Sequence, residues 1–488
     1  MDGSLAVARG AFAAIAHGVP PGTAGQRGAA WLLAETALGA VPESAAELAR
    51  WREGFAAGLA RIEARLQDPG FPPRGSLAAI AAAPFFLAYH GEDDRPLLSR
   101  LGDLLARAAS RLRPELAAAG QRPPAGRRAA IVSSFLRDCT VGHYFASWIP
   151  ALRAAGFELC LVQLGPRHDA FTERLGAAAG RLRIVAEGPD ALADWLAAER
   201  FDLILYPELG MDGRVLAVAA LRLAPLQLCA WGHPITSGLP TIDAFLSVGA
   251  MEPEQGEAHY RERLLRLPGL GTAYPAPPPP EALDRASLGL PARRPLLFYP
   301  HAPFKIHPED DALLAALAAA RPSLAVVLFE GERPSFRARL ERRLARAFAA
   351  AGADPARQLL WLPLMPRRRF LAVARACDLM LDCLRWSGGN TTLDALSVGL
   401  PVLTRPGRFM RGRQSAAMLA MIGADGLVAG SREDLLAQAV RLLDEAELRA
   451  AWRARLEAGA PALYGRGEAG PALAAALEGM LADASGPA

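Results

Sequence analysis

Lys305 and Asn390 are the residues whose types point most directly to chemistry. Of the 54 lysine and arginine residues, Lys305 is the single lysine, and Asn390 is the single asparagine of the chain. Lysine and arginine replace one another on a solvated surface but not in a tight charged site. The alternative is that a chain poor in lysine and asparagine retains one residue of each type by chance. Because both stand in loops with further signs of ligand binding, we expect both to be functional.

Lys305 lies in the segment Phe298–His307, which follows an apolar run typical of a strand and precedes a helix expected to open near Pro308. An ammonium group in such a loop can reach a diphosphate and offset the charge of a leaving group. The alternative is an ordinary solvated lysine.

The segment Trp386–Asp394, with the sequence WSGGNTTLD, follows the strand expected at Leu379–Cys383 and opens a helix. Its glycines allow close backbone approach, and a helix N-terminus offers unpaired N–H groups to a phosphate. The alternative is a capped helix with Asn or Thr as N-cap. We expect a phosphate cradle with hydroxyl donors, and Asp394 as an acceptor for a ribose hydroxyl; the cradle comprises Gly388, Gly389, Asn390, Thr391 and Thr392.

Three other loops hold candidate residues. In the turn after Leu364, backbone atoms of Met365 can read a base edge and Phe370 can stack on the base; the alternative is a basic surface turn. His143 and His233 each follow a strand expected in the first α/β unit. They are predicted to lie at the mouth of a cleft opposite Lys305, where imidazoles suit acid–base work, although a histidine is often structural.

The elements that position these loops fall into several parts. Residues 1–122 show helical spacing of apolar residues and predict an all-α domain, without a clean 34-residue repeat. After a break at Gly120–Arg128, apolar runs alternate with helical patterns over 123–270. A Pro-rich linker spans 271–295, a second alternating unit spans 296–460, and a C-terminal helix is expected over 461–488. The pattern predicts two doubly wound parallel sheets with a cleft at the carboxyl ends of their strands.

Composition and missing motifs exclude several classes. The net charge of +4 does not favour a nucleic-acid binder, and the five cysteines lack a CxxC spacing. No GxGxxG with a following acid, no GxxxxGK[ST] and no metal-ligand pattern occur, so neither a nicotinamide cofactor nor a metal is expected. The absence of a long apolar run and of a basic leader predicts a cytoplasmic protein with no membrane segment.

The chain resembles the O-GlcNAc transferase, SPINDLY and bacterial N-glucosyltransferase family, glycosyltransferase family 41. The resemblance covers roughly residues 128–445. It rests on Val132–His143, Leu223–Asp243, Phe304–Pro308, Cys377–Thr404 and the loop Pro406–Ala417 that contains Arg413.

The resemblance implies an α/β GT-B fold, with two Rossmann-like units facing a cleft behind an all-α N-terminal domain. It implies metal-independent, inverting transfer from a nucleotide sugar, expected to be UDP-linked. In that family's pattern Lys305 stabilises the leaving diphosphate, the 388–392 loop cradles phosphates and Asp394 holds the ribose. Met365, Arg367 and Phe370 flank the base, Arg413 belongs to the donor site, and His143 and His233 line the acceptor and sugar side.

This sequence departs from the family pattern in several places. Cys139 replaces the first histidine of the 132–143 block, and the phosphate loop reads Gly-Gly-Asn-Thr-Thr. Gly-His-Pro at 232–234 leans toward N-glucosyltransferases, whereas Arg413 leans toward O-GlcNAc transferases. The expected function is transfer of a hexose or N-acetylhexosamine to a protein Ser, Thr or Asn side chain. The alternatives are a GDP-fucose-dependent protein fucosyltransferase, a sugar-nucleotide epimerase and a non-catalytic nucleotide-binding or interaction protein.

Overall fold

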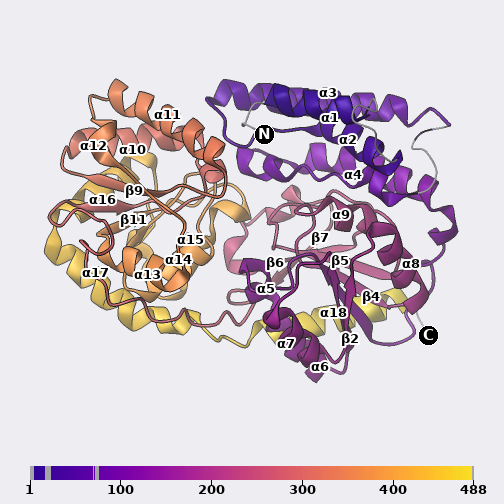
Figure 1. The fold of residues 1–488 in the computed structure, drawn as a ribbon. Coiled ribbons are helices and arrows are strands. Elements are labelled where there is room, and N and C mark those ends of the chain that lie inside the picture. Colours follow the sequence, from indigo (N-terminus) through magenta and orange to yellow (C-terminus); the bar gives the residue numbers. More distant parts are fainter. Residues whose placement is uncertain (1–4, 17–23, 70, 72–75, 486–488) are drawn as a thin grey trace.

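The structure is a computed structural model that describes residues 5–16, 24–69, 71 and 76–485. A helical layer at the N-terminus is followed by two α/β units, each built on a parallel sheet (Figure 1). Across these described residues, no helix combines the length and the apolar character that a bilayer crossing requires.

The N-terminal layer is helical, and within its described residues no strand occurs before residue 128. Its longest helix, α3, begins at Ser44, whose side chain accepts from the Glu47 amide, and buries one apolar stripe against the layer. The elements of this layer are α1 (Leu5–Ala16), α2 (Ala24–Thr36), α3 (Ala45–Arg65), η1 (Leu77–Ile80), η2 (Phe85–His90), α4 (Arg95–Leu112) and η3 (Pro114–Leu116).

The first α/β unit contains a seven-stranded parallel sheet of order β3-β2-β1-β4-β5-β6-β7. Its strands are β1 (Arg128–Ser133), β2 (Glu158–Leu164), β3 (Leu182–Val185), β4 (Leu203–Tyr206), β5 (Leu226–Ala230), β6 (Ala244–Val248) and β7 (Arg263–Leu267). Its helices are α5 (Thr140–Phe145), α6 (Trp148–Ala154), α7 (Ala170–Ala179), α8 (Pro189–Glu199) and α9 (Gly213–Ala219), with η4 (Gly249–Met251) and η5 (Gly256–His259). The apolar runs at residues 129–134, 158–164, 182–186, 202–206 and 226–231 predict five strands, and β1 to β5 confirm them. Strands β6 and β7 were not predicted.

The second unit contains a five-stranded parallel sheet of order β10-β9-β8-β11-β12. Its strands are β8 (Leu296–Phe298), β9 (Ala325–Phe329), β10 (Leu359–Leu362), β11 (Leu379–Leu381) and β12 (Val402–Leu403). The helical elements are η6 (Pro303–Lys305), α10 (Pro308–Ala320), α11 (Pro334–Ala350), α12 (Pro355–Gln358), α13 (Arg367–Ala376), α14 (Asn390–Ser397), η7 (Met410–Gly412), α15 (Gln414–Met421), η8 (Asp425–Leu427), α16 (Arg432–Asp444), α17 (Ala446–Gly459) and η9 (Ala460–Leu463). The apolar runs at residues 296–299, 325–329, 359–362, 379–382 and 401–404 predict all five of these strands.

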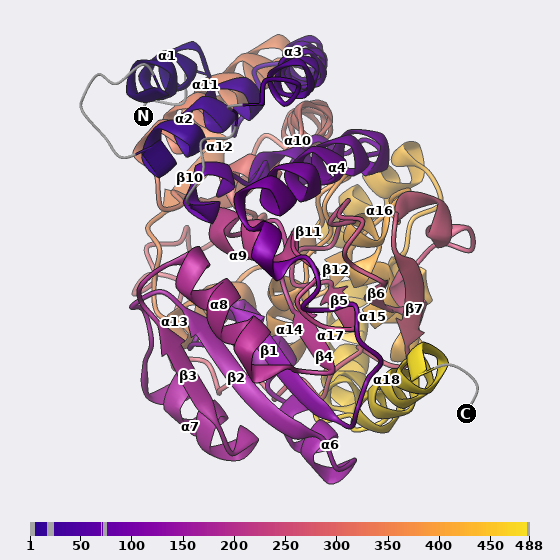
Figure 2. The ribbon, with the colours of Figure 1, turned by 90° about the vertical axis from the view of Figure 1, so that its right-hand side faces the viewer.

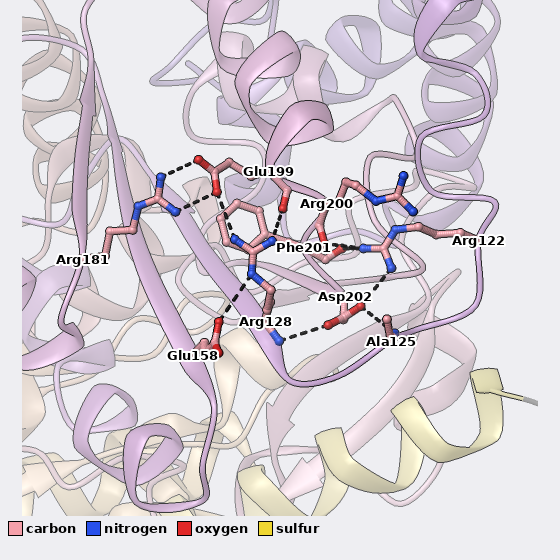
Figure 3. Close-up of polar contacts among 9 residues, drawn as sticks. All are labelled: Arg122, Ala125, Arg128, Glu158, Arg181, Glu199, Arg200, Phe201 and Asp202. Atoms are coloured by element: carbon pink, nitrogen blue, oxygen red, sulfur yellow. Dashed lines mark hydrogen bonds and ion pairs between the residues drawn. The ribbon is translucent and has the colours of Figure 1, made fainter.

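The connection between the helical layer and the first sheet is anchored at Asp202, next to β4. Its carboxyl group accepts from Arg122 Nη1 at 3.0 Å and from the amides of Ala125 and Arg128 at 2.9 and 3.1 Å (Figure 3). Arg128 also contacts Glu199 (Figure 3). These contacts fix the start of β1 at the amino edge of the sheet and leave its carboxyl edge open for function.

The helical layer contacts both α/β units. Buried Arg411 of the second unit pairs with Asp94, which also pairs with Arg52. Arg343 of α11 donates to Pro42 O at 2.7 Å and to Ile306 O at 2.8 Å. Figure 2 shows α3 lying beside α11. The layer thus holds the loop that carries Lys305.

The C-terminal helix α18 (Ala469–Ser485) follows the second unit but returns to the first. It contacts α6, β5 and β7, and Figure 1 shows it in yellow against the first sheet. Its buried Leu473 and Leu477 supply the packing face. The two α/β units are therefore joined by this crossing as well as by the Pro-rich linker.

Candidate active site

The site is built at the point where the strand order of the second sheet reverses. Strands β8 and β11 are neighbours, and β9 and β12 extend the sheet to opposite sides of them. Ligands in such sheets bind at this switch point, outside the carboxyl ends of the strands. The loop after β8 carries Lys305 and the loop after β11 carries Trp386–Asn390, so the two strongest sequence predictions meet at one place.

Lys305 ends η6, and its side chain is partly buried. Its Nζ lies 5.4 Å from the centroid of the Trp386 ring, a cation–π contact. Within the described chain its ammonium makes no hydrogen bond and no ion pair. Burial lowers the pKa of Lys305, and the nearby Cys383 and Asp382 oppose that shift. An uncompensated cation in this position is suited to bind an anion.

The loop after β11 is organised by Asp382, whose carboxyl group is buried. Oδ1 accepts from the amides of Cys383 and Gly388 at 3.1 and 2.8 Å. Oδ2 accepts from the hydroxyls of Ser387 and Thr404 at 2.8 and 2.9 Å. Because these four groups all donate to one carboxylate, Asp382 fixes the path of the glycine-rich loop.

Thr392 supports this loop from inside. Its side chain is fully buried, and its Oγ1 lies 2.6 Å from Ser415 Oγ. Gly388 is required here, because a Cβ would lie 2.4 Å from Thr392 Oγ1 and 2.7 Å from Thr391 Oγ1. The hydroxyl of Thr392 therefore faces the interior, whereas Thr391 is partly exposed, and the predicted place of both residues in a phosphate cradle stays a prediction.

The N-terminus of α14 points its free amides toward the cleft. Within the described chain, the backbone N–H groups of Gly389, Asn390 and Thr391 have no hydrogen-bond partner. Asn390 Nδ2 donates across the cleft to Thr140 Oγ1 of α5 at 3.2 Å, and its Oδ1 is buried without a partner. The arrangement fits an anionic ligand, as predicted from the glycine-rich sequence.

Asp394 and Arg367 form an ion pair. Arg367 Nη2 lies 2.6 Å from Asp394 Oδ1, and burial raises the pKa of Asp394 while Arg367 opposes that shift. Nε and Nη2 of Arg367 both donate to Oδ1 of Asp394. Oδ2 makes no hydrogen bond to the described residues, so it can still accept from a ribose hydroxyl. The ion pair also joins α13 to α14, and the place of Arg367 beside the base stays a prediction.

Met365 and Phe370 line a cavity of about 790 Å³. Phe370 packs on Phe298 and Phe329, at centroid distances of 5.4 and 5.3 Å. Its remaining surface is available for stacking on a base. Arg367 does not line this cavity. All three parts of the chain contribute to its walls, through Phe85, Phe86, Phe135, Met211, Phe304 and Phe336 among others.

His143 lies on α5 of the first unit, half-buried. Its Nε2 is 2.8 Å from Asp138 Oδ1, and its ring meets the edge of Phe171. The Asp138 amide in turn donates to Asp169 Oδ2 at 2.9 Å. Asp138 therefore orients an accessible imidazole, as acid–base chemistry requires.

His233 differs from the prediction in its exposure. Its side chain is buried rather than at an open mouth of the cleft, because Phe85 of η2 stacks on it at 5.4 Å. Burial, with a smaller effect of Arg411, lowers the pKa of His233 to about 3. The imidazole is therefore neutral at physiological pH.

Arg413 begins α15 and belongs to the loop after β12. Its Nη1 donates to Gly407 O at 3.1 Å, and its Nε is buried without a partner. The adjacent Gln414 reaches the glycine-rich loop, since a Cβ on Gly389 would lie 3.0 Å from Gln414 Oε1. Arg413 thus lies near the predicted donor loop, and its role in binding stays a prediction.

Glu208, which follows β4, is a buried acid that the sequence did not single out. Its Oε1 accepts from Ser133 Oγ at 2.8 Å, and its Oε2 is buried without a partner. Burial raises the pKa of Glu208 from 4.5 to about 8. The folded protein therefore keeps a proton on Glu208 that the unfolded chain loses as the pH rises above about 4.5.

Replacing Glu208 by glutamine should remove this part of the pH dependence. Wild-type stability should fall between about pH 4.5 and pH 8 because the unfolded state binds fewer protons there. The variant should exceed wild type by about 4 kcal/mol at pH 8 and match it near pH 4. Urea unfolding across this range measures the difference, and parallel curves for the two proteins would contradict the expectation.

Several site components carried little sequence signal. Asp382 lies at the end of a predicted strand, and this position is the signal in the sequence that could have identified it as a site residue. In the sequence, the aromatic residues of η2 are recognisable only as part of an apolar run. Among the described residues, no three His, Cys, Asp or Glu side chains converge as metal ligands. Metal independence stays a prediction.

Comparison with known proteins connects this geometry to one family. The sequence model described as Glycosyl transferase family 41 matches residues 333–460. A SPINDLY protein of Solanum lycopersicum, described as a probable UDP-N-acetylglucosamine–peptide N-acetylglucosaminyltransferase, is 25% identical over 47% of this chain and 24% of its own length. A UDP-glucose:protein N-beta-glucosyltransferase of Actinobacillus pleuropneumoniae is 25% identical over 50% of this chain and 38% of its own length. The chain therefore spans well under half the length of these relatives.

A solved structure extends the comparison to nearly the whole chain. A mutant O-GlcNAc transferase of Thermobaculum terrenum aligns with a TM-score of 0.66 and 24% identity, covering 99% of this chain and 98% of the other. This likeness shows the fold, and the predicted GT-B architecture with an N-terminal helical region is confirmed. Through residues 333–460 and these relatives, the predicted resemblance to glycosyltransferase family 41 is confirmed as well.

Proposed function

We propose that this chain transfers a hexose or N-acetylhexosamine from a UDP-linked sugar to a Ser, Thr or Asn side chain of a protein. One observation carries the proposal: the unpaired Lys305 ammonium and the free amides of α14 lie at the same switch point of the second sheet. The activities named for the two relatives support a UDP-linked donor and a protein acceptor.

The proposed chemistry follows from these groups. The acceptor atom attacks the anomeric carbon from the face opposite the diphosphate, so the configuration inverts. The bond from that carbon to the phosphate oxygen breaks, and the nucleoside diphosphate leaves with the electron pair while the acceptor loses its proton. Lys305 and the α14 amides stabilise the negative charge that builds up on the leaving group. We expect this transfer to proceed without a metal ion.

Titration of the purified protein with UDP and, separately, GDP tests the donor site. We expect UDP to bind more tightly than GDP, and UDP-sugars then to label a protein acceptor. Tighter binding of GDP would favour the protein fucosyltransferase alternative. Conversion of the donor without an acceptor would favour an epimerase. Binding of neither nucleotide would overturn the proposed function.

Cys139 replaces a histidine of the family pattern, so the alternative function is a non-catalytic nucleotide-binding or interaction protein. A protein that binds UDP but transfers no sugar to any acceptor in a peptide library would favour this alternative. Transfer that disappears when His143 is changed to alanine would exclude it. The same library identifies the acceptor residue, which separates hydroxyl from amide transfer.

A further inference from the structure

Tyr144 is a buried phenol next to the phosphate-binding loop that the sequence did not single out. It lies on α5 of the first unit, and its side chain is nine-tenths buried. Its hydroxyl is enclosed and has no hydrogen-bond partner among the described residues. A buried hydroxyl without a partner is costly, so such a group in a cleft indicates a missing ligand atom.

The hydroxyl of Tyr144 is aimed at the N-terminus of α14. A Cβ built on Gly389 would lie only 2.8 Å from this oxygen, so the hydroxyl lies directly beside the backbone of Gly389. Thr140 lies one helical turn earlier on the same face of α5 and contacts Asn390. One face of α5 therefore meets the glycine-rich loop of the opposite unit.

Polar groups from three segments of the chain lie around the hydroxyl. The Tyr144 ring packs 5.3 Å from that of Tyr274 in the linker. The Arg367–Asp394 ion pair lies within electrostatic range of it. The buried Oδ1 of Asn390 also lacks a partner. Two orphaned polar atoms, one of them a donor, thus flank the free amides of α14.

We propose that the Tyr144 hydroxyl donates a hydrogen bond to a phosphate oxygen of the nucleoside diphosphate, from the α/β unit opposite the one that cradles it. The inference rests on the proposed function and adds a binding residue to that site. A phenol O–H can donate to a phosphate oxygen without adding charge. The diphosphate would then be enclosed between α14 and α5, so that binding draws the two units together.

The test is a calorimetric titration with UDP of wild type, Tyr144→Phe and Tyr206→Phe. Tyr206 is the matched control, because its hydroxyl is likewise buried without a partner but lies at the end of β4, away from the glycine-rich loop. Tyr144→Phe should weaken UDP binding about 10-fold, since hydrogen bonds to charged groups contribute at this level. Tyr206→Phe should stay within about twofold of wild type.

Thermal unfolding without nucleotide separates binding from folding. Neither variant loses a hydrogen bond, so both should unfold at or above the wild-type temperature. UDP affinity in Tyr144→Phe within twofold of wild type, or an equal loss in Tyr206→Phe, would overturn the inference and leave the proposed function standing. A wild-type protein that binds neither UDP nor GDP would instead overturn the proposed function, and this inference with it.

Discussion

Replacing Lys305 by methionine should lower the rate of sugar transfer by about 100- to 1,000-fold and leave the protein folded. Loss of one preorganised donor at a developing oxyanion has an effect of this size. The ammonium makes no ion pair in the described structure, and its contact is with the Trp386 ring, so the unbranched methionine side chain can pack in its place. The measurement is kcat with a saturating UDP-sugar, together with thermal unfolding.

Lys305→Arg and Arg441→Met are the controls for this experiment. Arginine keeps the charge but spreads it over a planar fork, so it should restore only part of the rate if a compact ammonium is needed. Arg441 lies exposed on α16 in an ion pair with Glu445, and its replacement should leave transfer unchanged. Full activity in Lys305→Met would contradict the role assigned to the ammonium. Equal activity in Lys305→Arg would remove the significance of the single lysine.

Replacing Asp382 by asparagine should destabilise the protein by about 3 kcal/mol and abolish measurable UDP binding. The carboxyl group accepts from the amides of Cys383 and Gly388 and from the hydroxyls of Ser387 and Thr404. An amide would present an NH2 group to two of these donors and leave buried polar groups unpaired. The glycine-rich loop would then lose its conformation. Thermal unfolding and UDP titration measure the two effects.

Asp378→Asn is the matched control for Asp382. Asp378 lies just before the same strand, β11, where it accepts from the Leu296 amide at 2.8 Å and contacts Arg285. That edge of the sheet is opposite the site. Its replacement should lower stability and leave UDP affinity unchanged. UDP binding of wild-type strength in Asp382→Asn would contradict the assignment of this residue as the support of the loop.

The sequence alone predicted the architecture and the common location of the loops that carry Lys305 and Asn390. Apolar runs that alternate with helical patterns indicate parallel sheets, and parallel strands place their following loops at one edge. Lys305 and Asn390 could therefore be assigned to a common site without coordinates. The edge strand β7 escaped prediction because its arginines interrupt the apolar run, and β6 was likewise missed.

Only the tertiary structure decided which side chains face the cleft and which face the interior. Thr391 and Thr392 are adjacent and chemically alike, yet packing against Ser415 turns the second hydroxyl inward. His233 is covered by Phe85, a residue more than a hundred positions away whose approach no local pattern encodes. Tyr144 meets Gly389 only because the two units close on one another. Residue type and local periodicity determined the elements and their chemistry, whereas side-chain direction and burial depend on long-range packing between segments that the sequence pattern does not pair.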